Sequence, residues 1–107
     1  MEIREFQKII RETYVEKDSK RGKAETFQWF IEEIGELARA LKSGKKSEMI
    51  HEFSDAIAWL FSLANLYGVD MEEAVARYKE GCPKCHHIPC ICDENRKKDL
   101  EEFQDSR

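Results

Sequence analysis

The amino-acid sequence predicts an all-α domain of four helices, followed by a short cysteine-rich loop. Apolar residues recur at helical spacing, no alternating β-branched run occurs, and both prolines lie beyond residue 82. A chain of 107 residues has room for one small domain. Glycines at positions 22, 44, 68 and 81 divide the chain at helix-like intervals, which sets the expected helix ends.

The first two helices are expected on either side of Gly22. Before it, apolar residues recur at helical spacing from Ile3 to Tyr14. Between Gly22 and Gly44, seven apolar residues form one stripe centred on Ile34. Such a stripe is typical of an amphipathic helix, so we expect it to face the core.

The third helix is expected from Ser47, as its N-cap, to Tyr67. Asp70 is the predicted N-cap of a fourth helix, with Glu73 at the capping-box position. We expect this helix to end near Gly81.

The predicted boundaries are residues 1–81 for the helical domain, 82–92 for the cysteine-rich loop and 93–107 for a charged tail. A net charge of −4 argues against a nucleic-acid-coating protein. The longest nearly apolar run, residues 56–66, is far shorter than the roughly 20 residues that span a membrane. No leader with a basic and then an apolar segment opens the chain, so we expect a cytoplasmic protein.

Acidic residues on the second and third helices form a candidate metal site. In an antiparallel hairpin around Gly44, Glu36 and Glu52 lie eight residues from the glycine on either side, and Glu33 and Asp55 lie eleven. At about 1.5 Å rise per residue, both pairs are level on facing helices. Each helix contributes its two acids at i, i+3 spacing, so they project to one side. Four carboxylates at one level need a hard divalent cation, which favours Mg²⁺ or Mn²⁺.

The neighbourhood of these acids supports two further expectations. His51 directly precedes Glu52 and is expected to point away, so the Glu-x-x-His pattern of di-iron bundles is missing. The third helix is apolar on two sides, and a domain of this size covers only one of them. We therefore expect a homodimer or homotetramer.

Two segments, residues 32–38 (EEIGELA) and residues 51–57 (HEFSDAI), resemble the signature of MazG-like nucleotide pyrophosphohydrolases. The resemblance covers about residues 25–80 and implies an all-α fold. It also implies that Mg²⁺ is bound by Glu33, Glu36, Glu52 and Asp55. The implied reaction is hydrolysis of (deoxy)nucleoside triphosphates to the monophosphate and pyrophosphate by dimers or tetramers.

This chemistry needs further residue types. A carboxylate that does not bind the metal can accept a proton from the attacking water, and Glu32 and Glu36 are the candidates. Trp29 and Trp59 share helix faces with the acids and are candidates for the base pocket, although such tryptophans more often belong to a core or subunit interface. The candidate cations for the phosphates are Lys17, Lys20, Arg21, Lys23, Arg77 and Lys79.

Four cysteines within eleven residues form a second candidate metal site, as Cys82-Pro-Lys-Cys85 and Cys90-Ile-Cys92. Two close thiol pairs can bind a tetrahedral Zn²⁺ of structural type, with His86 or His87 as a possible replacement ligand. Disulfides are the rival interpretation. The segment also resembles the CPxC…PCxC tail of some MazG-like proteins.

Two other function classes stay open at this point. The first is a zinc-loop adaptor that binds nucleic acid or protein, which a basic surface around the cysteines would favour; the segment itself has only Lys84 and two histidines. The second is a family member that binds nucleotides without hydrolysing them.

Overall fold

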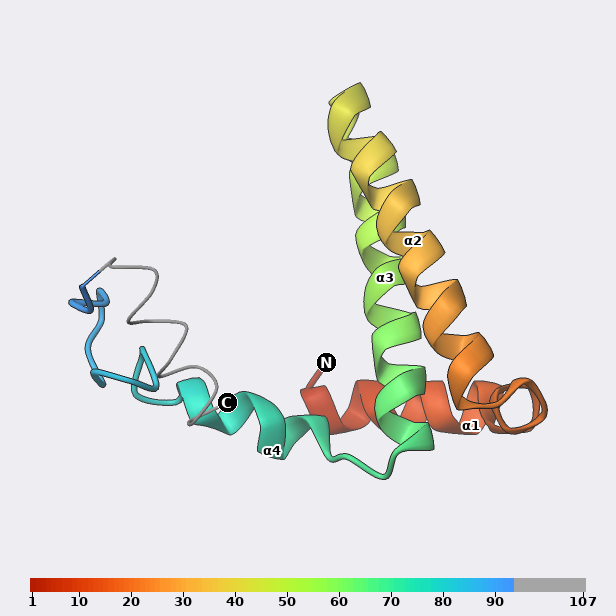
Figure 1. Cartoon of the computed structure of the whole chain (residues 1–107), viewed down its shortest axis with the longest axis horizontal. Helices are drawn as coiled ribbons and strands as arrows, with labels where there is room; N and C mark the ends of the chain where they lie inside the picture. Colours follow the sequence, from red (N-terminus) through yellow and green to blue (C-terminus); the bar gives the residue numbers. More distant parts are fainter. Residues whose placement is uncertain (94–107) are drawn as a thin grey trace. The chain divides into compact units, whose positions relative to one another are not determined.

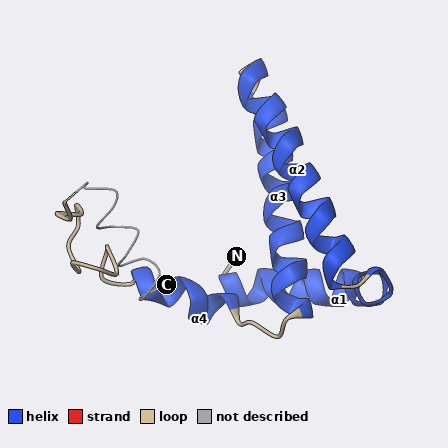
Figure 2. Ribbon diagram, in the orientation of Figure 1, coloured by secondary structure: helices blue, strands red, loops and turns tan. Residues whose placement is uncertain are grey.

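Residues 1–93 are described by a computed structural model of the chain, and all regular structure within them is helical (Figure 1, Figure 2). This confirms the predicted all-α class. The predicted tail lies outside the described residues from position 94 onward. The helices are α1 (Ile3–Arg21), α2 (Lys23–Ser43), α3 (Lys46–Leu66) and α4 (Met71–Val75), followed by a 3₁₀ turn (Ala76–Tyr78).

Two glycines end α1 and α2 as the sequence predicts. Gly22 and Gly44 have positive φ angles of 83° and 73°, a region that glycine enters without a steric penalty. Their N–H groups donate to the carbonyls of Asp18 and Ala40. The predicted N-cap of the third helix is wrong: Lys45 is the N-cap and Ser47 lies in the first turn. Because Gly44 already reverses the chain, α3 begins sooner than expected.

Asp70 caps α4 as predicted. Its Oδ1 accepts a hydrogen bond from the backbone N–H of Glu72 at 2.9 Å, and its Oδ2 accepts one from Arg4 at 3.1 Å. The helix itself is shorter than expected. It changes to 3₁₀ geometry after Val75 and ends before Gly81.

The chain divides into two compact units, Met1–Ala74 and Val75–Arg107, and each is described by itself. In the first unit α2 and α3 form a hairpin, and α1 packs against it (Figure 1). Phe6 of α1 meets Phe61 of α3 edge to face, with ring centroids 4.9 Å apart. No helix within residues 1–93 is long and apolar enough to cross a membrane. The buried apolar side chains are Ile10, Ala40, Ala56, Phe61 and Ala64.

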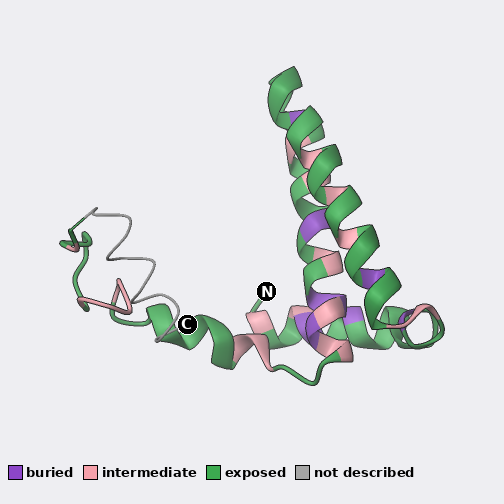
Figure 3. Ribbon diagram, in the orientation of Figure 1, coloured by how far each residue is buried: buried purple, intermediate pink, exposed green. Residues whose placement is uncertain are grey.

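The apolar stripe expected to form the core is largely open in the single chain. Ile34, at its centre, is 42% exposed, and Phe53 on α3 is 54% exposed. Figure 3 shows the α2–α3 hairpin coloured as exposed over most of its length. The hairpin instead buries Thr26 and Ala40 of α2 and Ala56 of α3. The predicted core face is therefore wrong, because a helical period shows which side is apolar but not which chain covers it. We call the exposed set the open apolar face: Phe27, Ile31, Ile34, Leu41, Ile50, Phe53, Ile57 and Leu60.

Candidate functional site

A pair of stacked tryptophans marks the register of α2 and α3. Trp29 and Trp59 lie fifteen residues before and after Gly44. Their rings are stacked, with centroids 6.2 Å apart and 19° between the planes. Equal offsets from the turn therefore bring residues to the same height on the two helices. By the same counting from Gly44, residues 36 and 52 lie at one height on the two helices, and residues 33 and 55 lie at another.

The predicted metal-binding carboxylates share one electrostatic neighbourhood. The pKa of Glu33 is raised above its usual value, chiefly by burial and then by the negative charges of Asp55, Glu52 and Glu36. The charge of His51 acts in the opposite direction. The hairpin thus gathers the other three acids around Glu33, where their negative charges disfavour its ionised form.

One carboxylate oxygen of Glu52 has no hydrogen-bond partner in the part of the chain that the structure describes. Its side chain is only 19% exposed, and Oε2 is buried with no hydrogen-bond partner among residues 1–93. A buried carboxylate oxygen without a partner is costly, by about 1–3 kcal/mol or more. A cation at this point would satisfy it. The carboxylate oxygens around it are the ligands that hard divalent ions prefer, so the residues fit Mg²⁺ or Mn²⁺.

The expectation that His51 points away from the acids is wrong. Its Nε2 lies 3.3 Å from Oδ2 of Asp55 and 4.0 Å from Oε1 of Glu52. Residues four apart share a helix face, so His51 and Asp55 meet on α3. These three side chains offer ligand atoms within 4.8 Å of one another. A nitrogen donor is therefore available beside the oxygen ligands.

The other predicted site residues lie in different settings. Glu32 is exposed on α2, and Glu36 accepts a hydrogen bond from Arg39 at 2.7 Å. Lys20 is exposed near the end of α1. Lys79 belongs to the C-terminal unit, which is described separately from the carboxylates.

Arg21 and Lys17 are the predicted cations that the structure places in a cavity with Asp55 of the carboxylate site. Arg21, Trp59 and Asp55 all line a cavity of about 230 Å³. The guanidinium carbon of Arg21 lies over the Trp59 ring, 4.7 Å from its centroid. Its Nη1 donates to Oδ1 of Asp18 at 2.8 Å and to the hydroxyl of Thr26 at 3.4 Å. The aromatic ring and two hydrogen bonds hold the guanidinium in place.

Sequence reasoning missed Asp18, Tyr14 and Ser62, which also line this cavity. One feature of the sequence could have identified Asp18. It lies in the last turn of α1, where the helix dipole disfavours a negative charge. An acid retained there, three residues before an arginine, indicates a specific partner. Tyr14 and Ser62 left no comparable signal, because hydroxyl residues are common on helices.

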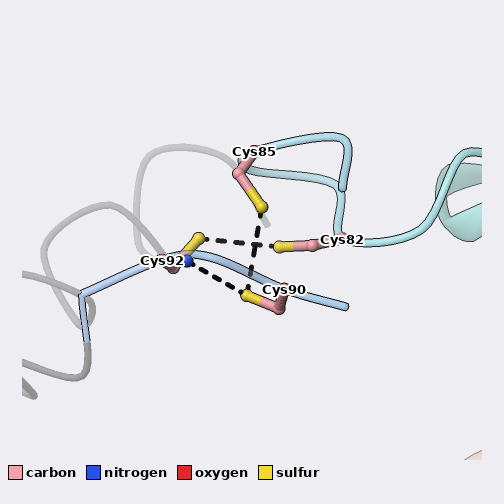
Figure 4. A group of neighbouring side chains, drawn as sticks. All are labelled: Cys82, Cys85, Cys90 and Cys92. Carbon is pink, nitrogen blue, oxygen red and sulfur yellow. Dashed lines mark hydrogen bonds between the residues drawn. The ribbon is translucent and has the colours of Figure 1, made fainter. Parts of the chain in front are cut away.

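The four cysteines converge in the C-terminal unit (Figure 4). The Sγ atoms of Cys82 and Cys92 are 3.7 Å apart, those of Cys85 and Cys90 are 3.9 Å apart, and all four lie within 4.8 Å. Sulfurs around a tetrahedral zinc, with Zn–S bonds of about 2.3 Å, lie about 3.8 Å apart. The cluster therefore fits Zn²⁺. The group of close donor atoms contains four thiols and neither histidine.

Backbone geometry shapes this cluster. His86 has a φ of 60°, and its N–H donates to the carbonyl of Cys82 at 2.7 Å, which closes the turn after the first cysteine pair. Gly81 has a φ of 93°, and a Cβ there would meet the Ile88 side chain and the carbonyl oxygen of His87, the latter at 2.6 Å. Only glycine fits such a close approach.

Three of the four thiols have shifted pKa values, and the shifts differ in direction. Backbone N–H groups of Ile91 and His87 lower the pKa of Cys85 to about 6, and N–H groups of the Lys84–Cys85 segment lower that of Cys82. Hydrogen bonding to Cys90 and Cys82 raises the pKa of Cys92 to about 12. Backbone donors aimed at sulfur stabilise thiolates, which are the form that binds a metal.

A sequence profile of the MazG nucleotide pyrophosphohydrolase domain matches residues 21–87. The chain belongs to this family. The MazG match contains all of α2 and α3, and with them the four carboxylates, both tryptophans and Arg21. Asp18 lies just outside it, and the match ends within the cysteine-rich loop.

Two curated proteins are similar to this MazG chain. The histidine biosynthesis bifunctional protein HisIE of Aquifex aeolicus (strain VF5) is 34% identical, over 69% of this chain and 42% of its own length. The uncharacterized protein YvdC of Bacillus subtilis (strain 168) is 29% identical, over 78% of this chain and 95% of its own length. The chain therefore matches less than half of HisIE and nearly all of YvdC.

Proposed function

We propose that the protein is a divalent-metal-dependent nucleoside triphosphate pyrophosphohydrolase. It converts a (deoxy)nucleoside triphosphate to the monophosphate and pyrophosphate. The supporting observation is the buried, unsatisfied oxygen of Glu52 among the gathered carboxylates of a MazG domain. A cluster of acids alone repels a triphosphate, so a cation must lie between protein and substrate.

Four residues would hold the Mg²⁺ or Mn²⁺: Glu33, Glu36, Glu52 and Asp55. A metal bound there supplies charge neutralisation for the phosphates and acidifies a coordinated water. Either Glu32 or Glu36 is the proposed general base. Arg39 donates a hydrogen bond to one oxygen of Glu36. The other oxygen is left either to bind the metal or to accept the proton of the attacking water.

The cavity next to Asp55 is the proposed substrate site. It combines the Arg21 cation with the Trp59 ring, and Trp29 stacks on the far helix against Trp59. A metal ligand, a fixed cation and an aromatic wall are the contacts a nucleotide needs. Lys20, exposed near the end of α1, is a proposed outer contact to the phosphates.

Hydrolysis of at least one common nucleoside triphosphate is the first expected result. All ribo- and deoxyribonucleoside triphosphates are incubated with Mg²⁺ and the released pyrophosphate is measured. EDTA should abolish the reaction, and added Mg²⁺ or Mn²⁺ should restore it, because the carboxylates cannot bind the phosphates without a cation. Binding of nucleotides with no pyrophosphate release would instead favour the non-catalytic alternative.

We propose that two or four chains assemble through the open apolar face. Eight large apolar side chains on α2 and α3 are each more than one-third exposed in the single chain. Monomeric proteins rarely expose so many together, because apolar surface in water costs about 25 cal/mol per Å². A second copy presents the same face, so the surface can cover itself in a symmetric pair.

Ile34→Glu is expected to convert the assembly to monomers. The substitution puts a charge at the centre of the apolar stripe, where pairing would bury it. Sedimentation at micromolar concentration gives the mass. Gln28→Glu is the matched control, since it adds the same charge at an exposed position off the centre of that face. A wild-type monomer at this concentration would contradict the proposal.

We also propose that the cysteine cluster binds one structural Zn²⁺. The sulfur spacing and the backbone N–H groups that favour thiolates both support it. Thiols kept free for a metal are typical of a reducing compartment, which agrees with the expected cytoplasmic location.

A further inference from the structure

One buried carboxylate beside the proposed metal site has no part in the proposed chemistry. Asp18 is 3% exposed and lines the same cavity as Asp55 and Trp59. Its Oδ1 accepts the hydrogen bond from Arg21, but its Oδ2 is buried with no partner in residues 1–93. Leaving a charged acceptor unpaired is costly, so the pocket is incomplete as it stands. A hydrogen-bond donor from a ligand would complete it.

The charges around Asp18 indicate which part of a nucleotide comes here. Arg21 lies 2.8 Å from Asp18, so the two charges balance each other. The carboxylate oxygen that remains repels phosphate oxygens. The phosphates are instead drawn to the positive charges that have no such partner: a cation bound at Asp55 and the exposed side chain of Lys17, which also lines the cavity. The end of the cavity next to Asp18 is therefore available to the uncharged base of the nucleotide.

The Asp18–Arg21 pair presents a donor and an acceptor side by side. Within the described residues both hydrogen bonds of Arg21 leave from Nη1, and its other N–H groups remain for a ligand acceptor. Cytosine and adenine carry an amino donor next to a ring-nitrogen acceptor, and guanine carries its amino donor next to N3. The one ring N–H of uracil and thymine that could pair is flanked by two carbonyl oxygens, which a carboxylate repels.

We propose that this cavity binds the base, and that Asp18 selects bases with an exocyclic amino group over uracil and thymine. The proposal rests on the function proposed above and specifies its substrate class. Asp18 accepts the amino N–H through Oδ2, Arg21 donates to the neighbouring acceptor, and Trp59 forms an apolar wall.

A purely structural role for Asp18 makes a different prediction. If Asp18 only held Arg21 in place, its loss would slow hydrolysis of every nucleotide by the same factor. If it reads the base, its loss changes the ratio between nucleotides. The ratio of kcat/KM for CTP and UTP is therefore the decisive quantity, because these two substrates differ only on the pairing edge of the base.

Wild-type protein is expected to prefer CTP to UTP by at least about tenfold in kcat/KM, the discrimination typical of an unpaired buried polar group. In Asp18→Asn the ratio should fall about tenfold or reverse, because the amide N–H donates to O4 of uracil. Glu16→Gln, the same chemical change at an exposed acid of α1, should leave the ratio unchanged. Equal wild-type rates for CTP and UTP, or an unchanged ratio in Asp18→Asn, would overturn the proposal.

Two further measurements keep the test decisive. If Asp18→Asn does not fold by circular dichroism, wild-type rates are compared for ATP and purine riboside triphosphate, which lacks only the amino group; equal rates overturn the proposal. If no triphosphate is hydrolysed, the proposed function fails. Base selection is then tested by titrating the α,β-imido analogues of CTP and UTP and following tryptophan fluorescence. Equal affinities overturn it.

Discussion

Glu33→Gln is expected to abolish hydrolysis and to stabilise the metal-free protein. Burial and three neighbouring carboxylates raise the pKa of Glu33 above 4.5. A carboxyl group whose pKa is higher in the folded than in the unfolded protein adds to the free energy of unfolding at pH values below its unfolded pKa. That contribution is lost as the pH rises through the folded pKa. At neutral pH the charge of Glu33 therefore opposes folding, and a neutral glutamine removes this cost.

The measurement pairs activity with thermal unfolding in EDTA. Activity should fall by at least about a hundredfold, because even residues that only support metal ligands cost ten- to a hundredfold. The melting temperature of Glu33→Gln should exceed that of wild type at pH 7, and the difference should disappear below pH 4, where Glu33 is protonated. Glu16→Gln, at an exposed acid in the interior of α1, should change neither quantity. Wild-type turnover in Glu33→Gln would refute the metal assignment.

The helices were predictable because local chemistry sets their ends. Gly22 and Gly44 end α1 and α2, and Asp70 caps α4, all as the sequence predicts. Counting residues from Gly44 also predicts the register of the hairpin, which the stacking of Trp29 on Trp59 bears out. Helix ends and short turns depend on a few neighbouring residues, so the sequence contains what determines them.

Side-chain surroundings were less predictable, because they depend on which elements pack together. The stripe around Ile34 has the period of a core face, yet it lies open while the flank carrying Glu33 packs against α3. His51 reaches Asp55 because the two residues are one helical turn apart. The prediction considered only that His51 is next to Glu52 in the sequence and did not consider this i, i+4 contact. Asp18 is buried only because α1 packs on the hairpin. The exposure of the Ile34 stripe and the burial of Asp18 do not follow from periodicity, whereas the His51–Asp55 contact does follow from i, i+4 spacing.

Cys90→Ser is expected to remove bound zinc and loosen the cysteine-rich loop while leaving the carboxylate hairpin folded. Purified wild-type protein should carry about one zinc per chain, and its thiols should not titrate until it is denatured or chelated. In Cys90→Ser the zinc content should fall severalfold, since one of four tetrahedral ligands is lost. His86→Ala is the matched control and should retain the metal, because His86 is not among the close donor atoms.

The expected separation of effects follows from where the two clusters lie in the chain. The cysteines belong to the C-terminal unit, in which residues 79–93 contain no helix or strand, so we expect this loop to depend on metal ligation to fold. The carboxylates lie on two 21-residue helices that fix each other. Amide hydrogen exchange in Cys90→Ser should therefore quicken after Gly81 and stay unchanged in α2 and α3. Glu52→Gln, by contrast, should retain zinc and lose activity. Zinc-free wild-type protein with its thiols paired as disulfides would refute the zinc site, and equal loss of activity in both variants would show that the loop contributes to the nucleotide site.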